Sequence, residues 1–86
     1  MRLEPDEVKA IATRLKRANG HLASVIRMLE EGTECEDALT QLAAVNKAIG
    51  RGGYALVSTG LQKCLAEGGP DSVDAQKLEK LFLALA

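Results

Sequence analysis

The sequence almost lacks aromatic residues: Tyr54 and Phe82 are the only two, and there is no tryptophan. The hydrophobic 47% of the chain must therefore build a core from leucine, alanine, valine and isoleucine. An aliphatic composition of this kind is typical of packed helices. The 86 residues predict one small domain, 1–86, and a chain this short buries too little surface alone to be comfortably stable. We therefore expect a second chain to complete the core.

Long apolar runs are also missing. No stretch reaches the roughly 18 apolar residues that a membrane span needs. The segment from Met1 to Glu7 is acidic and lacks the apolar run of a secretory signal. These absences favour the cytoplasm and no membrane contact. In that compartment two cysteines are more often catalytic, metal-binding or redox-sensing than a structural disulfide.

The net charge of −1 is uninformative, but the distribution of charge is not. Residues 8–29 carry five basic residues and no acid, and residues 38–66 carry three basic residues and no acid. Two solvated helix faces would explain this pattern. Alternatively, acid-free helices repeated in a symmetric oligomer could sum to the wide positive surface that phosphate binding requires.

Two long helices are predicted first. Apolar residues recur at three- and four-residue spacing from Val8 to Leu29, which predicts a helix over about 5–31, with Pro5 at its first position and Gly32 at its C-terminal cap.

Thr33 and Glu36 have the capping-box spacing, so a second helix is expected from there to Leu65 or Ala66. Gly50-Arg51-Gly52-Gly53 could split this helix, but the apolar stripe keeps its phase across the glycines, which favours one helix. After the break at Gly68-Gly69-Pro70, Asp71 or Ser72 can cap a short third helix. The expected fold is all-α, with helices in the order long, long, short.

Cys35 and Cys64 both fall on the second predicted helix. Their separation of 29 residues corresponds to a net rotation of about 20° and a rise of about 43 Å. They therefore share one face but lie too far apart for a disulfide, which needs α-carbons within about 7 Å. Either they are unrelated packed cysteines, or they meet between two chains.

An antiparallel pair of second helices would bring Cys35 to the partner's Cys64. In this register the paired residue numbers sum to 99, and three of the pairs set a larger side chain against a glycine. The pairs place Leu39, Leu42, Asn46 and Ile49 opposite Gly60, Val57, Gly53 and Gly50 of the partner subunit. The glycines would then permit close helix approach, which partly offsets their cost within a helix. We expect an antiparallel helical dimer.

The segments Arg14–His21 (RLKRANGH), Glu34-Cys35 and Gln41–Asn46 (QLAAVN) strongly resemble the CsoR family of bacterial repressors. Its members sense copper, nickel, formaldehyde or persulfides, and the resemblance covers roughly residues 5–85. It implies a disc-shaped homotetramer, built as a dimer of dimers, that binds operator DNA through basic residues and releases it after chemistry at an intersubunit site.

The resemblance also implies roles for particular residues. By position, Arg14 and Arg51 match the family's DNA-contact arginines, and Lys16 and Arg17 extend the same patch. His21 stands where the family usually has glutamine, and we interpret it as polar surface variation, with a contact to the DNA backbone as the alternative.

The sensing residues differ between branches of the family. Copper sensors of this family have a cysteine, a histidine 25 residues later, and a second cysteine four residues after the histidine. The corresponding positions in this chain are Cys35, Gly60 and Cys64, so the histidine is absent. Formaldehyde sensors have proline at position 2, where this chain has Arg2. Two cysteines without the histidine resemble the CstR branch, which senses persulfides and polysulfides. No metal and no cofactor is then required.

Three alternatives stay open at this point. One is a copper-responsive repressor that holds Cu(I) linearly through Cys35 and Cys64. Another is a small thiol enzyme, although the only histidine, His21, lies on the other long helix, far in sequence from either cysteine, and leaves no evident general base. The third is a helical interaction module without nucleic acid, which the acid-free segments and the family motif disfavour.

Overall fold

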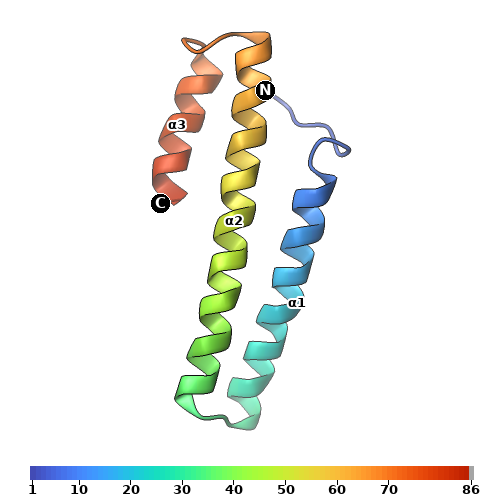
Figure 1. Ribbon diagram of the computed structural model, residues 1–86, viewed down its shortest axis with the longest axis vertical. Helices are drawn as coiled ribbons and strands as arrows, with labels where there is room; N and C mark the ends of the chain where they lie inside the picture. Colours follow the sequence, from blue (N-terminus) through green and yellow to red (C-terminus); the bar gives the residue numbers. More distant parts are fainter. Residues whose placement is uncertain (86) are drawn as a thin grey trace.

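Residues 1–85 are described in the computed structural model of the chain, and they form three helices and no strand. These are α1 (Lys9–Glu31), α2 (Cys35–Glu67) and α3 (Val73–Leu85). The helices α1 and α2 form an antiparallel hairpin, and α3 folds back along the C-terminal half of α2 on the side away from α1 (Figure 1). The predicted all-α class and the order long, long, short are confirmed.

The three helices form a single layer. The chain measures 51 × 25 × 14 Å along its principal axes, and a helix with its side chains is itself about 10–12 Å across. Domains normally bury their apolar faces between two layers. Here Val25 and Val45 are the largest side chains that are fully buried, and the rest of the core is small: Ala18, Ala38, Cys64 and Ala75.

Many large apolar side chains consequently remain exposed on this layer. They occur on all three helices and include Ile26, Leu29, Leu39, Leu42, Ile49, Tyr54, Leu56, Leu65, Leu81 and Leu83. Further apolar surface has to be covered before such a chain is stable in water. The expected dimer and tetramer stay predictions, and burial of the exposed leucines would provide the driving force for their assembly. Among residues 1–85, no helix combines the length and the hydropathy needed to cross a membrane.

The helix α2 runs without interruption through Gly50–Gly53, as the phase of the apolar stripe predicts. Gly52 is buried against α1, where a β-carbon would lie 2.7 Å from the Cδ2 atom of Leu15. Gly32 follows α1 with φ +94°, a backbone conformation that favours glycine, as expected at this cap.

The prediction that the first helix begins near Pro5 is wrong, because α1 begins at Lys9. Residues 4–7 form a turn in which the Glu7 N–H donates to the Glu4 carbonyl at 3.0 Å. The Glu4 N–H in turn donates to the Glu7 carboxylate at 2.8 Å. Pro5 therefore occupies the second position of a turn, which suits its fixed φ equally well. Contacts with α2, described below, hold this segment away from the axis of α1.

The predicted capping box at the start of the second helix is also wrong. The residue that precedes α2 is Glu34, and no side chain among residues 1–85 caps it. Thr33 instead donates a long hydrogen bond of 3.4 Å to the Glu34 carbonyl. At α3 the expected cap is present: the Ser72 hydroxyl accepts a hydrogen bond from the Ala75 N–H at 3.2 Å.

Candidate thiol site and nucleic-acid interface

The two cysteines lie near opposite ends of one helix. Cys35 is the first residue of α2, and Cys64 lies in its last turn. Because α2 is continuous, the two residues are about 43 Å apart along its axis at 1.5 Å per residue. Both are free thiols. A single chain therefore cannot bridge them without breaking α2.

The surroundings of the two thiols differ. Cys35 is exposed, whereas Cys64 is only 3% exposed. The Cys64 thiol donates to the Sδ atom of Met1 at 3.2 Å. One turn earlier on α2, Gly60 is buried beneath Leu78 of α3 and the methyl group of Met1. The structure thus leaves one thiol open to solvent and places the other under side chains from two different segments.

Residues 1–8, which we call the N-terminal strap, run from α1 across to α2 (Figure 1). The Lys63 ammonium, next to Cys64, donates to the Arg2 carbonyl at 2.6 Å and to the Glu7 carboxylate at 3.1–3.2 Å. The Glu4 N–H, and after it Lys63, lower the pKa of the Glu7 carboxyl. Sequence reasoning missed this arrangement, because partners 56 residues apart leave no local pattern.

Two glycines that the predicted register assigns to the partner helix already have contacts within the chain. A β-carbon at Gly60 would lie 3.3 Å from Leu78 of α3, and one at Gly53 would lie 3.3 Å from Leu85. Gly50, in contrast, has no such neighbour within 4 Å among residues 1–85. The register stays a prediction. In that register the partner helix and α3 would both contact the face of α2 around Gly60, so α3 would have to share this face or move away from part of it.

His21 is more than a variable polar residue on the surface, because its side chain connects two helices. Its Nε2 atom is hydrogen-bonded to the Gln41 side chain at 2.7 Å, which links α1 to α2, and the residue is half-buried. Within the described part of the chain, no group of three or more histidine, cysteine, aspartate or glutamate side chains could hold a metal ion.

The basic residues assigned to DNA are all exposed. Arg14 and Arg17 line a shallow hollow together with Asp6 and Lys9. Lys16 does not line this hollow.

Arg51 lies on α2, at the same level of the hairpin as Arg14 and Lys16. Leu15 of α1 contacts Gly52 of α2. Arg14 and Lys16 are the sequence neighbours of Leu15, and Arg51 is the residue before Gly52. The structure thus places Arg14, Lys16 and Arg51 at one level of the hairpin.

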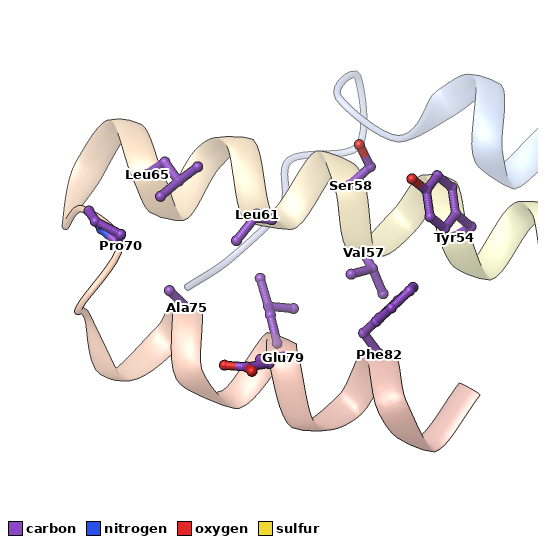
Figure 2. A pocket seen from close by; sticks show the side chains of 10 residues that line it. Tyr54, Val57, Ser58, Leu61, Leu65, Pro70, Ala75, Glu79 and Phe82 are labelled. Carbon is purple, nitrogen blue, oxygen red and sulfur yellow. The ribbon is translucent and has the colours of Figure 1, made fainter. Parts of the chain in front are cut away.

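A groove of about 480 Å³ follows the seam between α2 and α3 (Figure 2). Its lining is mostly aliphatic, and Tyr54 and Phe82 meet edge to face at one end, with ring centroids 6.0 Å apart. Among residues 1–85, Glu79 is the only charged residue that lines it, and no cysteine or histidine does. The groove therefore offers apolar contacts and, at Glu79, one carboxylate.

Comparison with known proteins gives the family. Residues 7–86 match the family model described as metal-sensitive transcriptional repressor. The copper-sensing transcriptional repressor CsoR of Mycobacterium ulcerans is 32% identical over 80 residues, which cover 93% of this chain and 68% of that protein. The copper-sensing transcriptional repressor RicR of Mycobacterium tuberculosis is 40% identical over 63 residues, covering 69% of this chain and 66% of that protein.

The uncharacterized protein YrkD of Bacillus subtilis is 42% identical over 53 residues, covering 62% of this chain and 84% of that protein. No solved structure matches the chain. The chain spans about two thirds of the length of the mycobacterial relatives. The resemblance found in the sequence is confirmed at the level of the family: the chain belongs to the metal-sensitive transcriptional repressors, the CsoR family.

Proposed function

We propose that this chain is a cytoplasmic repressor that binds operator DNA as a homotetramer and releases it when persulfide or polysulfide joins Cys35 to the partner's Cys64. Membership of a family of transcriptional repressors makes the chain a regulator rather than an enzyme. The observation that carries the proposal is the placement of both cysteines near opposite ends of one unbroken helix. A second, antiparallel α2 would bring each cysteine to the other.

The chemistry needs two thiols and no metal. A persulfide RSSH transfers its outer sulfur to the Cys35 thiolate, which forms a protein persulfide and releases RS⁻. The thiolate of the partner's Cys64 then attacks the Cys35 sulfur, forming an S–S bond and expelling HS⁻. Two thiols are oxidised and the transferred sulfur is reduced, so no other oxidant is required. A second sulfur transfer before closure gives a trisulfide.

The difference in solvent exposure between the two thiols supports an order for these steps. Cys35 is open to solvent and reacts first, while Cys64, at 3% exposed, acts as the second thiol once the strap and Met1 move aside. This movement offers a link to DNA release. The strap leads directly into α1, which carries Arg14, Lys16 and Arg17; with Arg51, these are the residues that we propose hold the DNA backbone.

A second candidate is a Cu(I)-responsive repressor, favoured by the copper-sensing mycobacterial relatives. Two thiolates can hold Cu(I) without a third ligand, because soft sulfur donors select this ion. In the same antiparallel register, Cys35 of one subunit and the partner's Cys64 would supply them.

One set of DNA-binding measurements distinguishes the persulfide-responsive repressor from the Cu(I)-responsive one. Affinity for the protein's own upstream promoter DNA is measured after treatment with polysulfide, Cu(I), peroxide or formaldehyde, for the wild type, Cys35→Ala and Cys64→Ala. Release by polysulfide, lost in both variants, supports the proposal. Release by Cu(I) alone replaces it with the second candidate, and absence of DNA binding in every condition removes both.

A further inference from the structure

We propose that Met1 is a metal ligand: its thioether and the Cys64 thiolate form a two-sulfur site for Cu(I). This inference rests on the positions of two side chains in one chain. It stands whether or not persulfide is the inducer, because it concerns the affinity of the protein for a soft metal ion.

The two sulfur atoms are already in contact. The Sγ atom of Cys64 lies 3.2 Å from the Sδ atom of Met1. Thiolate and thioether are both soft donors, which select Cu(I) over oxygen-preferring ions. Cys64 is 3% exposed and the Met1 side chain is 12% exposed, so both sulfur atoms are largely shielded from solvent. The unbranched methionine side chain allows the small separation that an ion between the sulfurs needs.

Gly60 makes room for the thioether. A β-carbon at this position would lie 3.6 Å from the methyl carbon of Met1, and it would also touch Leu78. A larger side chain at position 60 would occupy the space over Cys64 that Met1 now fills. Gly60 has no side chain that could act as a metal ligand. Its small size leaves room next to Cys64 for the sulfur of Met1.

The strap holds this donor in place. Lys63 binds the Arg2 carbonyl and the Glu7 carboxylate, which fixes the backbone directly after Met1. A donor positioned before the ion arrives loses less entropy on binding. On binding, the Cys64 thiol loses its proton to solvent and the thioether donates a lone pair, with no change of oxidation state. In the predicted register, Cys35 of the partner subunit adds a third sulfur.

The first test is a Cu(I) titration against a competing chelator. Wild type and Met1→Leu are both produced behind a cleavable leader whose removal leaves residue 1 first. Leucine keeps the volume and removes the sulfur, so the affinity for Cu(I) is expected to fall at least about tenfold, the lower limit for losing a supporting group at a metal site. The control Met28→Leu, on α1, is expected to bind as the wild type does. Equal affinity of Met1→Leu and wild type overturns the proposal.

A second test does not depend on how well Met1→Leu folds. In the Met28→Leu background, Met1 is the only methionine, and it can be replaced by selenomethionine. X-ray absorption of the Cu(I)-loaded protein is then expected to show selenium at bonding distance from copper, and its absence overturns the proposal. The polysulfide response of Met1→Leu is expected to persist, so failure of the persulfide function and failure of this site are distinguishable.

Discussion

The side chain of Leu15 on α1 lies directly against Gly52 on α2. A β-carbon at Gly52 would be 2.7 Å from the Cδ2 atom of Leu15 and 3.3 Å from its Cγ atom. This contact sets the distance between the two long helices at the level of Arg14 and Arg51. The geometry of the proposed DNA surface therefore depends on a glycine that carries no chemistry of its own.

Gly52→Ala is expected to destabilise the fold by roughly 1 kcal/mol. Alanine gains about 1 kcal/mol of helix propensity over glycine, but overpacking a tight contact typically costs about 1–3 kcal/mol. Gly20→Ala in α1 is the matched control, because no neighbour among residues 1–85 lies within 4 Å of its β-carbon position, and it is expected to gain up to about 1 kcal/mol. Denaturant unfolding measures both. A Gly52→Ala protein stabilised as much as Gly20→Ala would refute the close contact.

Gly50→Ala tests the antiparallel register. Within the described part of one chain its β-carbon position is open, so the substitution alone would stabilise α2. In the register, Ile49 of the partner subunit covers Gly50, and the added methyl group is expected to weaken self-association. Sedimentation over a range of protein concentrations gives the dissociation constant. Self-association as tight as in the wild type would show that no partner approaches closely there.

Local patterns predicted the helices but not every cap, because the capping box expected at Thr33 and Glu36 is not formed. The spacing of apolar residues predicted three helices, and the unbroken stripe predicted the continuity of α2 across Gly50–Gly53. The start of α1 was predicted too early because Lys63 and Glu7, 56 residues apart, hold the strap away from the helix. The Met1–Cys64 contact escaped prediction for the same reason. No local pattern shows which distant side chain will cover a thiol.

The strap is expected to loosen in acid. The pKa of Glu7 is lowered from its ordinary value of 4.5, first by the Glu4 N–H and then by Lys63. A carboxyl whose folded-state pKa is depressed contributes stability above its unfolded pKa, and this stability is lost as pH falls through the folded value. An NMR titration of the Glu7 carboxyl carbon is expected to show a midpoint below 4.5.

Lys63→Met is the matched variant for this titration. It is expected to raise the Glu7 midpoint only part of the way, because the Glu4 N–H, the larger cause, remains. A midpoint that does not move in Lys63→Met would show that the Lys63–Glu7 ion pair does not form in solution.

Arg51→Ala is expected to weaken binding to all DNA sequences alike. A residue that binds a phosphate contributes to the salt dependence of binding, so the log–log salt slope is expected to fall by roughly one for each phosphate that the protein no longer neutralises. Lys47→Ala, also exposed and one turn earlier on α2, is the control and is expected to change the slope less. If Arg51→Ala leaves both affinity and slope unchanged, α2 does not contribute to the DNA surface in the way proposed.

The central claim is that the thiol sensor forms between two chains, and subunit mixing tests it most directly. Cys35→Ala and Cys64→Ala proteins, each with one thiol, are unfolded together, refolded as mixed oligomers and treated with polysulfide. Peptide mass spectrometry under non-reducing conditions then detects sulfur bridges. A bridge from Cys35 of one variant to Cys64 of the other is predicted in the mixture. Its absence there, when the wild type forms it, would contradict an intersubunit sensor.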